Sequence, residues 1–88
     1  MDIKILQDEK EHIVFEIDNQ TIAELLRVYL NKDDSVSLAA WKREQQEKPV
    51  VMIIRTKGKA AKKALDDAVS HIEKDTDKIL DEFKKSIK

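Results

Sequence analysis

The stretch HIVFEIDNQTIAELLRVYL, from His12 to Leu30, contains the change of hydrophobic period that decides the fold. Its first part places isoleucine and phenylalanine at every second position, which is the period of a strand with one apolar face. Its second part places apolar residues three and four positions apart, which is the period of an amphipathic helix. We therefore predict a strand over 12–18 followed by a helix over 22–32.

The predicted helix has a start signal and an unusually wide apolar surface. Thr21 is followed three positions later by Glu24, which is the spacing of a capping box. Once Val28 is included, the apolar residues cover about 200° of the helix, whereas packing on one sheet needs a stripe of ~100°. Either Val28 or Tyr29 is simply exposed at the rim, or the helix is buried on two sides; we expect burial on two sides.

Working outward from this stretch, three further strands are predicted. Apolar residues alternate over 2–6, and the charged residues 8–11 close a hairpin with the strand at 12–18. Alternation returns over 36–42, and a polar loop over 43–48 leads to a strand over 50–56. That last strand is apolar without alternation, so we expect it to be central and covered on both faces.

The C-terminal part of the chain predicts one long helix. Apolar residues follow a helical face from Lys59 to Lys85, which at 1.5 Å per residue makes a helix about 40 Å long, against about 23 Å for a seven-residue strand. Its last turns would therefore extend past the sheet, unless they fray or pack on the first helix. The complete prediction is a single α+β domain over 1–88, a two-layer ββαββα sandwich with a four-stranded antiparallel sheet, two helices and a long C-terminal helix.

The two wide helical surfaces indicate an obligate partner protein. Burying each large apolar side chain of the overshooting turns would contribute roughly 1.5 to 3 kcal/mol. Six residues are the candidates for the intersubunit core: Leu26, Tyr29, Ile79, Leu80, Phe83 and Ile87.

Composition excludes several classes of function. The 88 residues include no cysteine, so disulfides, thiolate catalysis and cysteine-based metal sites are excluded. Seventeen basic and eighteen acidic residues leave a formal net charge of -1, so the whole chain has no strong attraction for nucleic acid. No apolar run is long enough for a membrane span, and the start lacks the basic region of a signal peptide, so we expect a cytoplasmic protein.

Few residues have the pattern of a catalytic or ligand-binding site. His12 and His71 stand apart from any compact metal-ligand pattern, and adjacent acids such as Asp66 and Asp67 do not face each other on a helix. We predict no catalytic residue, no metal and no cofactor. One basic cluster precedes and enters the long helix, where positive charge is unfavourable for the helix dipole; it comprises Arg55, Lys57, Lys59, Lys62 and Lys63.

Several segments together resemble the small alpha-like subunit family of archaeal DNA-directed RNA polymerases, subunit L. The segments extend along essentially the whole chain: 1–6, 15–17, 21–22, 25–27, 36–41 and 54–58. At the start of the first helix the family usually reads EDHTLGNLLR, and this chain keeps Thr21, Leu25, Leu26 and Arg27. It lacks the acid-histidine pair and the helix glycine, and residues 43–48 replace the family's usual histidine-proline-leucine.

The resemblance implies a non-catalytic assembly subunit of the polymerase, a nucleotidyltransferase. Such a subunit pairs as a heterodimer with a larger alpha-like subunit, which in archaea is the D-type subunit, and the helices of the two chains pack together. The pair is the platform on which the catalytic subunits assemble for transcription. The family carries its magnesium and zinc sites on other subunits, and no direct DNA contact is expected of this chain.

Two other functions fit parts of the sequence. A stand-alone nucleic-acid-binding module would use the basic cluster for phosphates, although Trp41 is the one obvious stacking residue. A homodimeric scaffold unrelated to polymerase would use the same helical surfaces for a second copy. Salt-dependent nucleic-acid binding would favour the first of these alternatives, and self-association of the isolated chain would favour the second.

Overall fold

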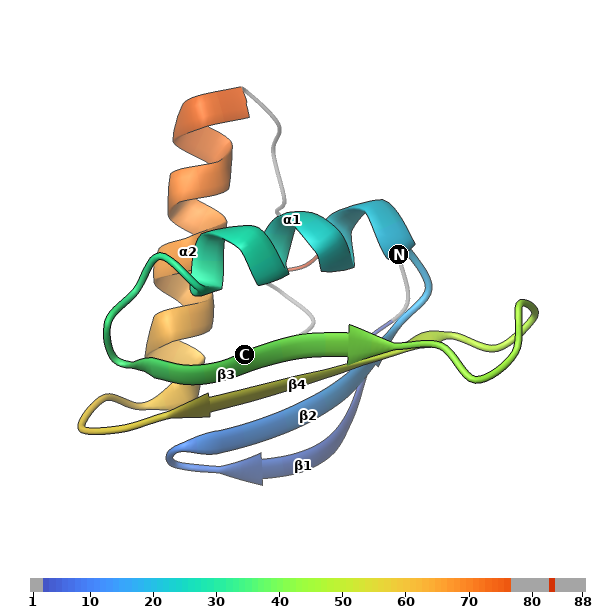
Figure 1. Cartoon of the computed structure of the whole chain (residues 1–88), viewed down its shortest axis with the longest axis horizontal. Coiled ribbons are helices and arrows are strands. Elements are labelled where there is room, and N and C mark those ends of the chain that lie inside the picture. The colour runs from blue at the N-terminus through green and yellow to red at the C-terminus, as the bar shows by residue number, and fades with distance from the viewer. Residues whose placement is uncertain (1–2, 77–82, 84–88) are drawn as a thin grey trace.

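The computed structural model describes residues 3–76 and residue 83 of the chain (Figure 1). The four strands form one antiparallel sheet in the order β1-β2-β4-β3. This arrangement confirms the predicted α+β class, the ββαββα order and the four-stranded antiparallel sheet. The elements are β1 (Ile3–Glu9), β2 (His12–Ile17), α1 (Gln20–Leu30), β3 (Val36–Lys42), β4 (Val50–Thr56) and α2 (Ala61–Thr76).

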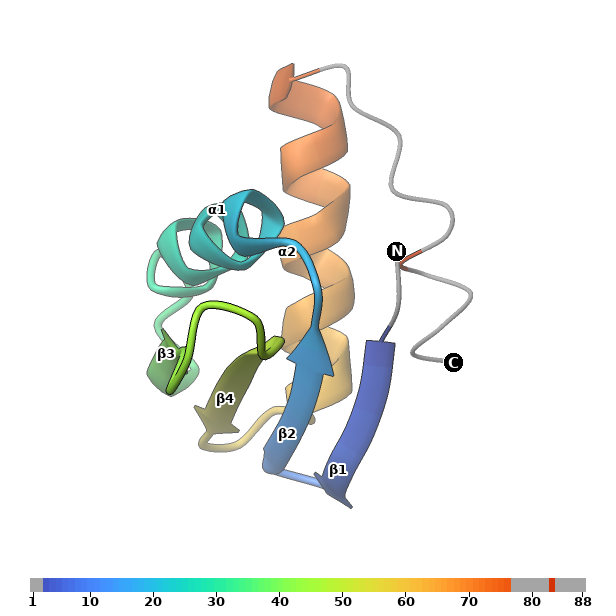
Figure 2. The ribbon, with the colours of Figure 1, turned by 90° about the vertical axis from the view of Figure 1, so that its right-hand side faces the viewer.

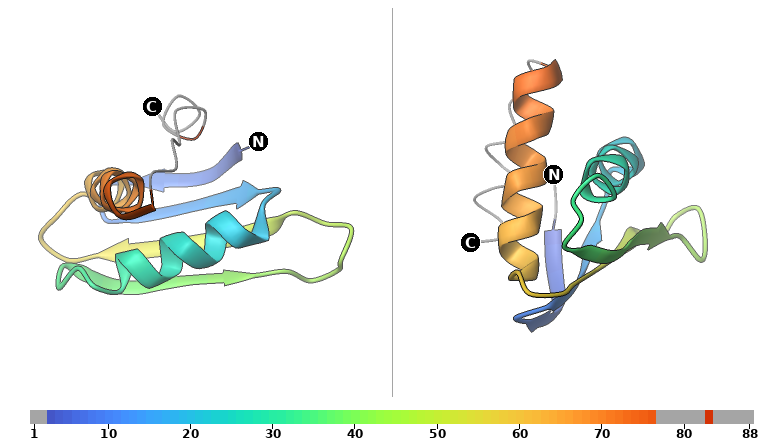
Figure 3. Two further views of the ribbon diagram at one scale, coloured as in Figure 1. Left: turned by 90° about the horizontal axis from the view of Figure 1, so that it is seen from above. Right: turned by 60° about the vertical axis from the view of Figure 1, so that its left-hand side comes forward.

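Both helices lie on the same side of the sheet (Figures 2 and 3). Helix α1 runs along the sheet over β3 and β4, whereas α2 rises from one end of the sheet and extends above it (Figure 1). Strand β4 is central, as predicted, because it pairs with β2 on one side and β3 on the other. The prediction that β4 is covered on both faces is wrong, since Val51 and Ile53 point away from the helices and remain partly exposed.

The β1–β2 hairpin is tighter than predicted. Strand β1 continues through Glu9, which is paired with His12, so the turn consists of Lys10 and Glu11 alone. Because β1 is an edge strand, its charged side chains at this end reach solvent while the main chain still pairs with β2. The prediction from charge alone therefore placed the start of the turn two residues too early.

Helix α1 begins earlier than predicted and has a different cap. Asn19 has an extended backbone, with φ at -127° and ψ at 102°, and its side-chain oxygen accepts a hydrogen bond of 3.0 Å from the Ile22 amide. This is the N-cap geometry, so the proposed capping box of Thr21 and Glu24 is wrong. Asparagine caps as well as threonine does, and the cap two residues earlier leaves the Glu24 carboxylate available for other partners.

The core lies between the sheet and the two helices. The inward residues of β2 and β4, such as Phe15 and Met52, are fully buried, and α1 contributes its own buried leucines. Helix α2 contributes mostly small residues near the sheet, which let it approach closely. The buried residues of α2 are Ala61, Ala64, Leu65, Ala68, Val69 and Ile72.

Candidate partner interface

The outer side of α1 carries a groove that the chain's own core leaves open. The groove has a volume of about 450 Å³ and lies between the helix and strand β3. Leu25 and Val28 come from the helix and Trp41 from the strand, and Val28 is 38% exposed. Their spacing of three positions places the two helical residues on one face, side by side. We call this surface, lined by Gln20, Thr21, Glu24, Leu25, Val28 and Trp41, the α1 groove.

A hydrogen-bonded carboxylate organises the rim of the α1 groove. Glu24 accepts two hydrogen bonds from the Arg27 guanidinium, of 2.6 and 2.9 Å, and one of 3.1 Å from the Trp41 indole nitrogen. The bonds from Arg27, and then that from Trp41, lower the pKa of Glu24 from 4.5 to about 2. The indole is therefore held in one orientation at neutral pH, with its ring against the groove.

The opposite flank of α1 faces α2 and is already in contact with it. The Tyr29 hydroxyl donates a hydrogen bond of 3.1 Å to Asp75 of α2, and the Lys32 ammonium lies 4.6 Å from the centre of the Tyr29 ring. Burial, followed by the bond to Asp75, raises the pKa of Tyr29. Tyr29 is only half-buried, so its ring remains within reach of a partner at the junction of the two helices.

Two of the six residues expected at the interface lie inside the chain's own core. Leu26 is fully buried between α1 and the sheet. Phe83 is also fully buried, with its ring edge-on to Phe15 of β2 at a centroid distance of 5.9 Å. The expectation that Phe83 is exposed in the single chain is therefore wrong. The inner face of β2 offers it a large aromatic neighbour, so its burial needs no second chain.

Three other candidates, Ile79, Leu80 and Ile87, lie outside the described residues, as does most of the predicted helix beyond Thr76. The described helix α2 has 16 residues and begins at Ala61 rather than Lys59. At 1.5 Å per residue it is about 24 Å long. It projects above the sheet because it rises from one end of it (Figures 1 and 3), and at this length it is about as long as a seven-residue strand. The turns that were predicted to extend past the sheet lie outside the described residues.

Three members of the basic cluster form ion pairs within the chain. Lys59 lies 2.7 Å from both Asp33 and Asp67, so it joins the turn after α1 to helix α2. The hydrogen bonds from Lys59 lower the pKa of both carboxyls, and in return they raise the pKa of Lys59. Lys63 also pairs with Asp67, at 2.9 Å, and Lys62 pairs with Asp8 of β1, at 2.8 Å.

These ion pairs explain how α2 tolerates a basic cluster at its start. Positive charge at the start of α2 is unfavourable for the helix dipole, but Asp67 on the same helix and acids on neighbouring elements offset it. The cluster therefore offers a phosphate backbone much less net charge than its sequence indicates. The pairing argues against a stand-alone nucleic-acid-binding module.

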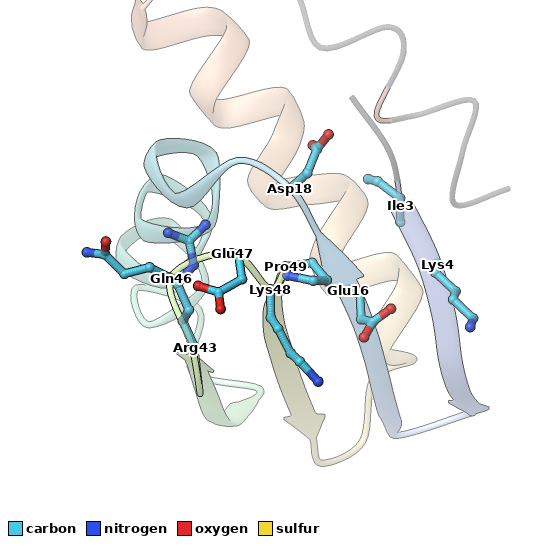
Figure 4. A pocket seen from close by; sticks show the side chains of 9 residues that line it. All are labelled: Ile3, Lys4, Glu16, Asp18, Arg43, Gln46, Glu47, Lys48 and Pro49. Carbon is cyan, nitrogen blue, oxygen red and sulfur yellow. The ribbon is translucent and has the colours of Figure 1, made fainter.

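Another surface cavity lies at the end of the sheet beside the β3–β4 loop (Figure 4). Its volume is about 480 Å³, and its lining mixes three basic with three acidic side chains. Such a balance concentrates neither the positive potential that a phosphate needs nor the carboxylates that a cation needs. The charged side chains are Lys4, Arg43 and Lys48 with Glu16, Asp18 and Glu47.

The histidines and acids give no sign of catalytic chemistry in the part of the chain that is described. His12 lies at the sheet surface, with its Nδ1 3.3 Å from the Gln7 amide and 3.6 Å from Glu9, and His71 is exposed on α2. Within residues 3–76 and 83, no three histidine or acidic side chains gather as metal ligands would. No helix of that same part has both the length and the hydrophobicity to cross a membrane.

Comparison with known proteins identifies the class to which this architecture belongs. The family model described as the RNA polymerase Rpb3/Rpb11 dimerisation domain matches residues 11–82. The match spans most of the chain, so the chain belongs to this family of RNA polymerase dimerisation domains. Comparison with curated protein sequences finds no match.

A solved structure shows the same fold in a particular polymerase subunit. The crystal structure of DNA-directed RNA polymerase subunit L from Thermoplasma acidophilum matches with a TM-score of 0.76 and 22% sequence identity. The match covers 98% of this chain and 88% of that chain. Together with the family, this likeness confirms the resemblance to the small alpha-like subunits that the sequence predicted.

Sequence reasoning missed two residues of the α1 groove, Leu25 as an outward residue and Trp41 as its neighbour. The signal for the first was present, because the apolar surface of the helix was too wide for one sheet. The sequence carried no signal for Trp41. The place of β3 at the sheet edge depends on its pairing with β4, and the β3–β4 loop separates the paired residues of the two strands in sequence.

Proposed function

We propose that this chain is a non-catalytic, L-type subunit of a cytoplasmic DNA-directed RNA polymerase, and that it pairs with the larger alpha-like subunit of that enzyme, the D-type subunit. The pair would serve as the platform on which the catalytic subunits assemble. The observation that carries the proposal is the α1 groove, an open apolar surface on a helix that belongs to a dimerisation domain. In this role the chain acts through its surface and needs neither a cofactor nor a metal.

The shape of the α1 groove favours a helix as its occupant. Leu25 and Val28 form a ridge along α1, and Trp41 forms the opposite wall, so a partner helix can insert its apolar ridge between them. Burying a large apolar side chain contributes roughly 1.5 to 3 kcal/mol, so two or three such residues form an adequate hot spot. Glu24 and Arg27, paired at the rim, would exclude water from its edge.

The six residues expected from the sequence take different roles in this proposal. Tyr29 is a direct contact at the α1–α2 junction. Leu26 and Phe83 support the interface from inside, because both are buried in the single chain. Ile79, Leu80 and Ile87 remain proposed contacts of the C-terminal part with the same partner.

The test is co-expression with the D-type subunit from the same genome, followed by size-exclusion chromatography with light scattering. A one-to-one complex is expected. Val28→Asp should weaken it roughly tenfold or more, because the groove would then bury an unpaired carboxylate. Gln45→Asp, which places the same charge in the exposed β3–β4 loop, is the matched control and should bind normally. Absence of any complex with the D-type subunit would overturn the proposal.

A further inference from the structure

The face of the sheet that points away from the helices carries an apolar centre. Three residues of neighbouring strands are in register there: Val14 of β2, Ile53 of β4 and Ala40 of β3. All three are partly exposed, whereas the residues before and after Ile53 on β4 are buried on the helix side. We call this surface, opposite the helices, the outer sheet face (Figure 2).

This apolar centre explains a feature of the sequence that the helices do not account for. Strand β4 reads VVMII without alternation, which is typical of a strand covered on both sides. The helices cover Val50, Met52 and Ile54 on the inner side. Val51 and Ile53, which alternate with these residues, face the outer side and remain partly exposed.

Charged residues flank the apolar centre in two rows. Toward the start of β4, Lys4 of β1 lies beside Glu16 of β2. Toward the end of β4, Glu9 of β1 lies beside His12 of β2. On β1, a cation at one end of the face is therefore matched by an anion at the other end. On β2, Glu16 and His12 occupy the corresponding positions, and the two rows continue to Lys42 of β3 and Arg55 of β4.

From this pattern we propose that the outer sheet face binds a second copy of this chain, face to face. A two-fold axis across the strands, along the row of Val14 and Ile53, places each strand over its own copy in the opposite direction. Lys4 of one copy then faces Glu9 of the other, and Glu16 faces His12, each twice by symmetry. Val14, Ile53 and Ala40 meet their own counterparts at the centre.

The alternative two-fold arrangement is unfavourable, which fixes the orientation. An axis parallel to the strands would place β1 over β3 of the other copy, so that Lys4 would face Lys42. Like charges in apposition oppose association. Edge-to-edge pairing is also disfavoured, since both edge strands have a register irregularity, between Ile5 and Gln7 in β1 and between Val36 and Leu38 in β3.

The size of the face predicts a weak, reversible dimer. Four strands spaced about 4.8 Å apart and about 20 Å long present about 400 Å² on each copy. Twice this area is below that of a standard stable interface, so we expect a dissociation constant on the order of 100 µM. The proposed pairing with the D-type subunit uses the helix side, so the two associations are compatible and can fail independently.

Sedimentation equilibrium of the full chain between about 5 and 500 µM tests the proposal. The expected result is a monomer at the low end and a rising dimer fraction at the high end. Ile53→Lys should abolish the dimer while binding of the D-type subunit is retained. Val28→Asp, on the helix side, should leave self-association unchanged.

A charge exchange tests the orientation without altering the apolar centre. Lys4→Glu places two carboxylates against each other in the dimer and should weaken it roughly tenfold, whereas Lys4→Glu combined with Glu9→Lys should restore it. A chain that stays monomeric throughout overturns the proposal. So does a dimer that Val28→Asp abolishes, or one that the double exchange fails to restore.

Discussion

The two sides of helix α1 have almost the same composition and opposite roles. On the inner side, Leu26 and Leu30 are fully buried against the sheet. On the outer side, Leu25 and Val28 line an open groove. Adjacent leucines in one helix thus belong to the core and to a candidate interface. The difference shows that an apolar residue of this chain serves folding or assembly according to the surface that lies opposite it.

The largest expected effect concerns Phe83, which the sequence assigned to the interface and the structure places in the core. Phe83→Ala should lower the free energy of unfolding of the isolated chain by about 3 to 5 kcal/mol, because it leaves a cavity beside Phe15. Urea unfolding followed by circular dichroism measures this loss, with Phe83→Leu as a milder control. Unchanged stability of Phe83→Ala would show that Phe83 belongs with the outer residues after all.

The adjacent leucines provide the sharpest version of the comparison. Leu26→Ala should cost about 2 to 5 kcal/mol of folding stability, whereas Leu25→Ala should cost about 1 kcal/mol or less, since Leu25 is only partly buried. Both variants replace leucine by alanine, so the change in helix propensity is the same in each and does not confound the comparison. Equal losses in urea unfolding would contradict the division of α1 into a core side and a docking side.

A smaller effect is expected where ion pairs join the two helices. Lys59→Met removes the cation shared by Asp33 and Asp67 and should cost about 1 kcal/mol at low salt. Lys62→Met, which removes an exposed pair with Asp8, should cost less than about 0.5 kcal/mol. Thermal unfolding at two salt concentrations measures both, and an equal response of the two variants would refute a joining role for Lys59.

The smallest expected effect is a pH dependence at the rim of the α1 groove. The folded-state pKa of Glu24, about 2, is below the ordinary value of 4.5, so its contribution to stability is complete above pH 4.5. That contribution is lost as the pH falls through about 2. The stability difference between the natural chain and Glu24→Gln should therefore be constant near neutrality and shrink in acid.

The fluorescence of Trp41, the single tryptophan, reports unfolding in that experiment. Glutamine keeps an oxygen that can accept from the indole, so the variant removes charge more than shape. A stability difference that grows as the pH falls would contradict the assignment of the low pKa to Glu24.

Sequence periodicity predicted the elements well where their signals were local. Strands β3 and β4 have the predicted bounds, because alternation marks β3 and a proline and a glycine flank β4 within a few residues. The cap of α1 was placed two residues late, because Asn19 and Thr21 are both acceptable caps and only the backbone geometry distinguishes them. The candidate site was predicted as a helix surface too wide for one sheet, with Val28 as a residue that widens it, but Leu25 and Trp41 were not recognised as part of it.

By itself, the sequence determined the fold class, the order of the elements, the family and the presence of more apolar helical surface than one sheet can cover. These properties depend on local period and on composition. The tertiary structure alone decided that Phe83 packs on Phe15, that Trp41 closes the α1 groove, and that the basic cluster is largely paired. Each of these features depends on contacts between residues distant in the chain, and local periodicity carries no information about what such residues meet.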